Sequence, residues 1–236
     1  MSSAMARLKL AAGVLGPVLF VVVFLIEGAT RPGYSPWRHF VSQLSTGDQS
    51  WMQIANFMVC GALVLFFVSG LRGALGPGKG ITLGSVLLAI FGLGLVVAGI
   101  FVTDPAVGYP PGSPLHPVQT LHGLIHGLAG LAVFVSLPLA CFALARRFAG
   151  DPRWRGWVAY SIVTGLLVLA SFVVANVTSV LDATGAVPNA PTGLLQRLGI
   201  ILGWGWIALL ALRLLRDNRR TSRDGTQAGA GTRADT

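Results

Sequence analysis

The sequence has few charged residues. Only 11% of its 236 residues are Asp, Glu, Lys or Arg, 53% are hydrophobic, and the mean hydropathy is +0.72. Soluble domains carry roughly 25% charged residues, so this composition excludes an ordinary soluble fold and indicates a membrane protein. The net charge of +9 does not indicate a nucleic-acid partner, because the basic residues lie in short segments and a tail between apolar runs. Membrane lipids are the partners that we expect, and the sequence indicates no particular protein partner.

The sequence also lacks the residues and motifs on which many soluble enzymes depend. Its two cysteines, Cys60 and Cys141, lie within apolar runs and would occupy different depths of a helical bundle. A disulfide between them is not expected, and each is interpreted as a small buried apolar residue. No phosphate-binding loop, Gly-x-Ser-x-Gly elbow or dinucleotide fingerprint occurs. These patterns leave open whether the protein is an enzyme.

Six apolar runs are long enough for membrane-spanning helices, which need about 20 mostly apolar residues. They cover residues 8–26, 51–71, 81–102, 121–144, 157–177 and 193–215. The first run is expected to remain as a span, because Glu27-Gly28-Ala29 is a poor signal-peptidase site. We therefore predict an all-α integral membrane bundle of six transmembrane helices over residues 1–216. Residues 217–236 have almost no large apolar side chains and are predicted to form a disordered basic cytoplasmic tail.

The basic residues predict the orientation of this bundle. With the N-terminus inside, fourteen of the seventeen Lys and Arg residues fall in inner segments, and the other three are Arg31, Arg38 and Arg197. Positively charged loops stay on the cytoplasmic side of a membrane. We therefore expect a multi-pass protein of the cell membrane with both termini in the cytoplasm. The same assignment places all four histidines on the outer side.

The first outer loop carries a helical pattern of its own. Ser35-Pro36 is typical of a helix N-terminus, and Trp37, Phe40, Val41 and Leu44 follow at helical spacing. Gly47 would end such a helix. The pattern predicts a short amphipathic helix over residues 35–45 that lies in the outer membrane interface.

Histidines near the start of the fourth run are candidate metal ligands. His122 and His126 are four residues apart, which places both imidazoles on one helical face. A catalytic zinc ion needs three protein ligands and an open position. His39 or His116 could supply the third, and Asp104 could be a ligand or an orienting acceptor. The alternative interpretation is that these histidines are ordinary polar residues at wet helix ends.

The third and fourth runs should meet near these histidines. Gly123 and Gly127 lie about 100° around the helix from the histidines, a position that admits a close neighbour. Asp104 ends the third run, so we expect its carboxylate to reach His122 or His126.

Four other polar residues are candidates for ligand binding. Arg197 lies one or two turns into the sixth run, so it should face the bundle interior, pair with an outer carboxylate, or extend to the interface. Glu27, Arg38 and Ser42 lie on the same predicted side. We predict an outward-facing polar pocket that binds a metal ion, with zinc the first candidate, or a lipid head group, and that is formed by His39, Asp104, His122, His126 and Arg197. The alternatives are a metal-dependent hydrolase acting on lipid, and an accessory protein or small transporter without catalytic activity.

Two segments resemble a known family. Tyr34-Ser35-Pro36-Trp37-Arg38-His39-Phe40-Val41-Ser42-Gln43-Leu44-Ser45 is similar to the first outer loop of the bacterial and archaeal family catalogued as domain of unknown function 998. Phe101-Val102-Thr103-Asp104-Pro105, followed by His122-Gly123-Leu124-Ile125-His126, is similar to a second segment of that family. The resemblance covers the chain up to about residue 215. It implies a six-helix membrane domain and no particular activity.

A chemical similarity concerns the ceramidase and adiponectin-receptor superfamily. Its members hold zinc with three histidines, an aspartate and a serine inside a seven-span bundle. This chain has comparable residues in His122, His126, His39, Asp104 and Ser42, but its span count and the order of its motifs differ. The similarity is therefore one of chemistry and not of fold.

Overall fold

The computed structural model describes the backbone of residues 3–116 and 118–231, and the side chains of residues 4–116 and 118–218. This part of the chain forms six long helices: α1 (Ser3–Thr30), α2 (Ser50–Leu75), α3 (Ile81–Ile100), α4 (Leu121–Ala149), α5 (Arg155–Ala183) and α6 (Thr192–Gly231). Each contains a segment long and apolar enough to cross a membrane, and the described residues include no β-strand. The predicted all-α bundle of six transmembrane helices is confirmed.

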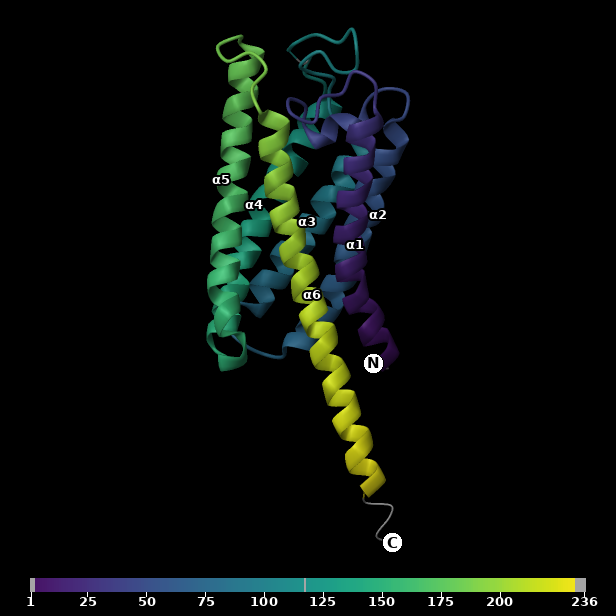
Figure 1. Cartoon of the computed structure of the whole chain (residues 1–236), viewed down its shortest axis with the longest axis vertical. Coiled ribbons are helices and arrows are strands. Elements are labelled where there is room, and N and C mark those ends of the chain that lie inside the picture. The colour runs from purple at the N-terminus through teal and green to yellow at the C-terminus, as the bar shows by residue number, and fades with distance from the viewer. Residues whose placement is uncertain (1–2, 117, 232–236) are drawn as a thin grey trace.

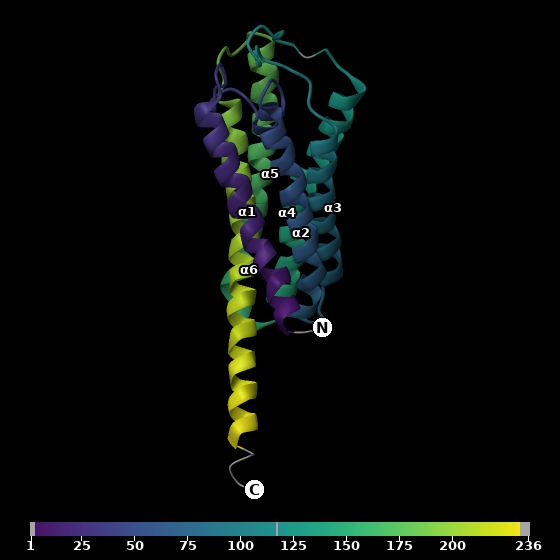
Figure 2. The ribbon, with the colours of Figure 1, turned by 90° about the vertical axis from the view of Figure 1, so that its right-hand side faces the viewer.

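The helices form a closed ring (Figures 1 and 2). Each helix packs against its neighbours in sequence, and α6 returns to pack against α1. Short connections at residues 76–80 and 150–154 require α2 and α3, and likewise α4 and α5, to lie antiparallel. Glycines allow close approach within the ring: a Cβ atom on Gly61 would lie 2.7 Å from the Gly92 carbonyl oxygen, and one on Gly94 would lie 3.2 Å from that of Ala129.

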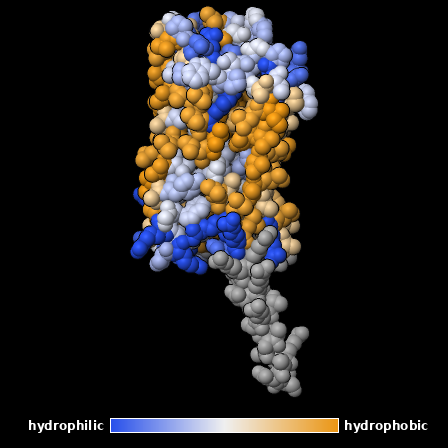
Figure 3. Space-filling view, in the orientation of Figure 1, coloured by the Kyte–Doolittle hydropathy of each residue, from blue (hydrophilic) through white to orange (hydrophobic). Residues whose placement is uncertain are grey.

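The surface of the ring matches a lipid environment. Large apolar side chains are exposed on every helix, among them Val22, Val59, Leu93, Leu131, Leu166 and Leu202. On the face shown in Figure 3, hydrophobic side chains predominate in the middle of the molecule, and hydrophilic side chains gather toward its two ends. Such a surface would be unfavourable in water but needs no cover in a bilayer. The protein is therefore a multi-pass membrane protein.

The two ends of the ring differ. We call the end that carries the α1–α2, α3–α4 and α5–α6 connections the loop end, and the opposite end the basic end. Helix α1 begins and α6 ends at the basic end (Figure 1). This arrangement agrees with termini on one side of the membrane, and the assignment of that side to the cytoplasm stays a prediction. Helix α6 continues to Gly231, past the expected end of the sixth span, and the division into a membrane domain and a tail also stays a prediction.

The α1–α2 connection differs from the predicted amphipathic helix. Only Val41–Ser45 is helical, as a 3₁₀ helix, and residues 36–38 form a turn. Val41, Gln43, Leu44 and Ser45 are no more than 3% exposed, so the 3₁₀ helix packs into the loop end of the ring. The helix is shorter than predicted because the carbonyl groups of Pro36 and His39 accept hydrogen bonds from a side chain of α6. The predicted place of this segment at the membrane interface remains unconfirmed.

Candidate functional site

Arg197 of α6 binds the α1–α2 connection. Its side chain is 6% exposed, and Nη1 donates to the carbonyl oxygens of Pro36 at 2.7 Å, His39 at 3.0 Å and Gly193 at 2.9 Å. Nη2 donates to the hydroxyl of Tyr34. Among the described residues no carboxylate pairs with Arg197, and its guanidinium does not extend to the surface. Carbonyl dipoles solvate this buried charge. Arg197 thus faces the interior, which was one of the expectations from the sequence, and it neither pairs with a carboxylate nor extends to the interface.

His39 joins two connections at the loop end. Its Nδ1 accepts a hydrogen bond from the Ser35 amide at 3.0 Å, so the proton of the neutral ring lies on Nε2, which donates to the Val107 carbonyl at 3.2 Å. Burial lowers the pKa of His39, and burial raises the pKa of neighbouring Tyr34 to about 12 despite the nearby Arg197 charge. Both ring nitrogens of His39 are therefore occupied in the folded protein.

Two ion pairs hold the α1–α2 connection at its edges. Arg38 binds both oxygens of Asp182 at the end of α5, at 2.5 Å and 2.9 Å. Glu27 pairs with Arg31 at 2.6 Å, and Arg31 also donates to the carbonyl oxygen of Gln49 at 2.9 Å. Two predicted binding residues, Glu27 and Arg38, thus attach this connection to helices α1 and α5.

Asp104 supports the N-terminus of helix α4, where Thr120 is the N-cap residue and its hydroxyl accepts from the Gly123 amide at 3.0 Å. Its Oδ1 accepts from the Thr120 hydroxyl at 2.6 Å, and its Oδ2 accepts from the Thr120 amide at 3.0 Å. The carboxylate lies so close to Gly123 that a Cβ atom there would be 1.8 Å from Oδ2. The close neighbour predicted at Gly123 is therefore present, whereas the one predicted at Gly127 is not, because a Cβ atom there would meet no atom within 4 Å. The hydrogen bond expected from Asp104 to His122 or His126 does not form, because the N-terminus of α4 holds the carboxylate.

The candidate metal ligands do not gather at one point. His39 lies in the loop network, His122 and His116 are exposed, and His126 faces the interior. In the described part of the chain no three His, Cys, Asp or Glu side chains lie close enough together to hold a metal ion. The zinc site, and the hydrolase that would use it, stay predictions from the sequence.

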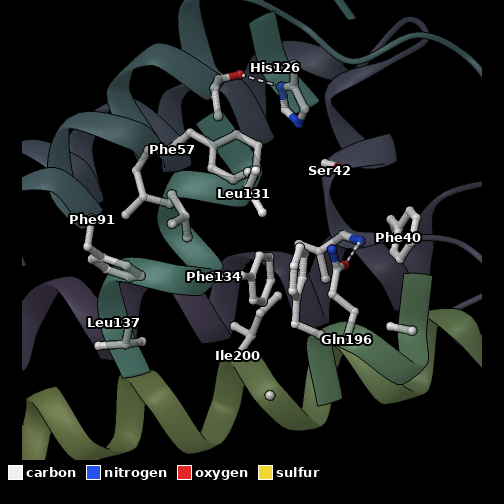
Figure 4. A pocket seen from close by; sticks show the side chains of 18 of the residues that line it. Phe40, Ser42, Phe57, Phe91, His126, Leu131, Phe134, Leu137, Gln196 and Ile200 are labelled. Carbon is white, nitrogen blue, oxygen red and sulfur yellow. Dashed lines mark hydrogen bonds between the residues drawn. The ribbon is translucent and has the colours of Figure 1, made fainter. Parts of the chain in front are cut away.

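A cavity of about 220 Å³ lies inside the ring, in the half nearer the loop end. All six helices contribute to its wall, which is mainly aromatic and aliphatic. Five polar side chains also line it: Ser42, Thr103, His126, Asn176 and Gln196. Figure 4 shows His126, Ser42 and Gln196 on one side of the cavity and Phe91 and Leu137 on the far side. The cavity is therefore polar toward the loop end and apolar toward the middle of the bundle.

His126 presents an acceptor to this cavity. Its Nδ1 lies 2.8 Å from the Phe101 carbonyl oxygen and 3.1 Å from that of Ala98. Carbonyl groups only accept, so Nδ1 carries the proton and Nε2 of the neutral ring carries a lone pair. In the described residues no side chain or backbone group binds Nε2, and Figure 4 shows the ring directed toward the cavity. His126 can accept a hydrogen bond from a ligand there.

The sequence analysis found part of this cavity. His126 and Ser42 were candidates, whereas Thr103, Asn176 and Gln196 were not. Asn176 and Gln196 are single amides inside or at the edge of apolar runs, and this isolation was a usable signal, because a polar group in a span usually has a function. Glu27, Arg38, His39, Asp104 and Arg197 surround the cavity's loop end without lining it.

The comparisons with known proteins agree with this architecture. A family model described as "Protein of unknown function (DUF998)" matches residues 14–213. No curated protein and no solved structure matches the chain. The match spans nearly all of the helical ring, and the chain therefore belongs to the DUF998 family of membrane proteins, whose function is unknown.

Proposed function

We propose that this protein binds a neutral amphipathic lipid, with one apolar chain in the cavity and a hydroxyl or carbonyl head group at its polar rim. The observation that carries the proposal is the gradient of polarity within the cavity. Phe91, Leu137 and Trp204 line the deep part, while His126 and Gln196 lie toward the loop end. A lipid presents the same gradient along its length, because its head group lies near the membrane surface and its chain lies deeper.

The rim favours a head group without charge. No charged side chain lines the cavity among the described residues. A phosphate placed there would have no counter-ion, and burying an unpaired charge is costly. Gln196 uses its Oε1 to accept from the Val41 amide at 2.7 Å, which leaves its amino group as a donor. With the His126 lone pair, the rim offers both a donor and an acceptor, which are the partners that a hydroxyl group needs.

The size of the cavity favours one chain. Pockets for drug-sized molecules measure about 300–1,000 Å³, and this one measures about 220 Å³. Leu131 of α4 and Asn176 of α5 line the cavity and are also exposed on the outside of the ring. The cavity therefore borders the lipid-facing surface between α4 and α5. We infer that a chain enters by this side opening while the rest of the molecule stays in the bilayer.

A pair of matched glycine variants tests the proposal. Gly130 lines the cavity, and a Cβ atom there meets no atom within 4 Å, so Gly130→Leu fills space without a clash. Gly205 has equally open surroundings but does not line the cavity, so Gly205→Leu is the control. Binding of monoolein to the detergent-purified protein is measured by displacement of a fluorescent monoacylglycerol. We expect Gly130→Leu to weaken binding by at least about tenfold, equivalent to ~1.4 kcal/mol, and Gly205→Leu to leave it unchanged.

The head group is tested at His126. His126→Leu removes the acceptor, so binding of monoolein should weaken by about fivefold to tenfold, the effect of losing one hydrogen bond. Methyl oleate has no hydroxyl to donate, and its binding should not change. Equal binding of monoolein by the wild type, Gly130→Leu and His126→Leu would overturn the proposal. Stronger binding of lysophosphatidylglycerol than of monoolein would refute the neutral head group.

A further inference from the structure

Basic side chains gather at the end of the ring opposite the lipid cavity. Ten described Lys and Arg residues lie there: Arg7, Lys9, Arg72, Lys79, Arg146, Arg147, Arg153, Arg155, Arg213 and Arg216. The described acidic residues at this end are Asp151 and Asp217. Figure 3 shows hydrophilic side chains as a cluster at the lower end of the molecule. The excess of cations gives this end a strongly positive field, whichever side of the membrane it faces.

A hollow of about 380 Å³ opens within this basic end. Its walls come from the first turns of α1, the last turns of α2, the last turn of α4, the connection between α4 and α5, and α6. Small and aliphatic residues form most of the wall, namely Ala6, Leu10, Gly70, Gly73, Ala74, Leu75 and Leu214. Its polar lining is Arg147, Arg153, Asp217 and Asn218, with Trp154 beside them. The hollow therefore joins an apolar surface to arginine side chains at the level where the helices end.

Arg147 is held in place at this hollow. One Nη2 hydrogen bond reaches the Leu75 carbonyl oxygen at 2.5 Å. The aliphatic stem crosses the α2–α3 connection so closely that a Cβ atom on Gly78 would lie 2.4 Å from its Cδ. In the described part of the chain Arg147 makes no ion pair, and its Nε has no hydrogen-bond partner. A fixed guanidinium with unused donors is prepared to bind an anion.

The other charged groups at the hollow are engaged with one another. Arg153 pairs with Asp151 at 2.8 Å and also experiences the charge of Asp217. Arg213 stacks on Trp154, with its guanidinium carbon 3.9 Å from the ring centroid, and donates to the Arg153 carbonyl. Asp151 thus forms its described ion pair with Arg153, whereas neither Arg147 nor Arg213 forms an ion pair among the described residues.

We propose that this hollow binds the phosphate group of an anionic phospholipid from the adjacent membrane leaflet. Guanidinium groups match phosphate oxygens in geometry and charge. Basic pockets between transmembrane helices on the cytoplasmic side bind anionic head groups, and the basic end is expected to face the cytoplasm. The apolar wall beside Arg147 favours a lipid over free phosphate, because it provides a surface for the glycerol and the first methylene groups. This site is separate from the neutral-lipid cavity.

A pair of adjacent arginine variants tests the proposal. Arg147→Gln removes the proposed phosphate ligand, and Arg146→Gln removes the same charge from an exposed neighbour that does not line the hollow. The full chain is purified in a neutral detergent, and its thermal unfolding is followed with dioleoylphosphatidylglycerol, dioleoylphosphatidylcholine or inorganic phosphate added. We expect phosphatidylglycerol to raise the unfolding temperature of the wild type and of Arg146→Gln, and the increase to be lost in Arg147→Gln. Phosphatidylcholine should give little increase.

Two further variants test whether the lipid occupies the hollow and binds Arg147. Gly73 lines the hollow and a Cβ atom there meets nothing within 4 Å, so Gly73→Leu should block the lipid while leaving Arg147 intact. Arg147→Lys, which keeps the charge but not the forked donors, should retain only part of the increase. An equal loss in Arg146→Gln and Arg147→Gln would overturn the proposal in favour of a diffuse surface field. If inorganic phosphate raised the unfolding temperature as much as phosphatidylglycerol does, the proposal that the ligand is a lipid would be wrong. Monoolein binding should be unchanged in all these variants.

Discussion

The contact between Asp104 and Gly123 leads to a quantitative prediction. The carboxylate of Asp104 binds Thr120 and faces the N-terminus of α4. A hydrogen bond to a charged group contributes about 1.5–3 kcal/mol, and less where it is only partly buried, as at Asp104, while an anion near a helix N-terminus contributes about 0.3–1 kcal/mol. Asp104→Ala should therefore lower the free energy of unfolding by about 1–3 kcal/mol.

Gly123→Ala should act on the same interaction from the other side. The new Cβ atom would lie 1.8 Å from Oδ2 of Asp104, so the carboxylate must leave its place and its hydrogen bonds to the N-cap residue Thr120 are lost. Alanine also favours the helix by about 0.5–1 kcal/mol relative to glycine. The net loss for Gly123→Ala is therefore expected to be about 0–2 kcal/mol. Once Asp104→Ala has removed the carboxylate, however, Gly123→Ala should be stabilising, because only the helix preference remains.

A double-mutant cycle measures this coupling. The free energy of unfolding of the four proteins is obtained in detergent micelles by titration with sodium dodecyl sulfate, followed by circular dichroism. The effects should be non-additive by about 1–3 kcal/mol, which equals the energy of the interaction between Asp104 and Thr120, whereas independent sites add to within about 0.3–0.5 kcal/mol. Gly127→Ala is the control, because its Cβ atom meets no atom within 4 Å, and it should stabilise the protein. Additive effects of Asp104→Ala and Gly123→Ala would refute the reasoning.

Two further predictions concern His39 and the topology. Burial lowers the pKa of the His39 imidazole in the folded protein. As the pH falls, the imidazole is therefore protonated in the unfolded chain before it is protonated in the folded protein. The contribution of neutral His39 to stability is thus present above its ordinary pKa of 6.5 and is lost as the pH falls below it. Unfolding at pH 7.5 and pH 5 should show a smaller loss of stability on acidification in His39→Gln than in the wild type, and an equal loss in both would contradict this. In a chain with Cys60 and Cys141 replaced by alanine, a membrane-impermeant maleimide should label Ser113→Cys but not Arg220→Cys in intact cells, and the reverse pattern would invert the proposed orientation.

The helical ring could be predicted from the sequence because bilayer thickness and composition determine where spans occur. Each apolar run falls within one of the six helices or ends within two residues of it, as the third run does beyond Ile100. The α1–α2 connection could not be predicted in the same way. Its spacing of Trp37, Phe40 and Leu44 is typical of an amphipathic helix, yet carbonyl groups within it bind Arg197, about 158 residues further along the chain. Local periodicity carries no information about such a distant donor.

Only part of the candidate site could be predicted, because the sequence shows side chains but not the backbone groups that bind them. Side-chain chemistry identified His126 and Ser42, both of which line the cavity. The same chemistry suggested carboxylate partners for Arg197 and an imidazole partner for Asp104, whereas the actual partners include backbone carbonyl groups and a backbone amide. Every residue carries these backbone groups, so their use leaves no pattern in the sequence. The cavity itself arises from packing, and open space beside Gly130 cannot be read from neighbouring residues.

The contact between Arg197 and the α1–α2 connection sets an order on biosynthesis. The carbonyl groups of Pro36 and His39 emerge early in translation, and the arginine that binds them emerges only with the last span. Until the sixth span is made, the α1–α2 connection lacks the Arg197 side chain that binds it. Once the span is inserted, these carbonyl groups bind the Arg197 charge, which the hydrocarbon region of the membrane disfavours. The final span thus completes both the ring of helices and its closure at the loop end. A chain truncated before α6 would leave the carbonyl groups of Pro36 and His39 without the Arg197 side chain that binds them.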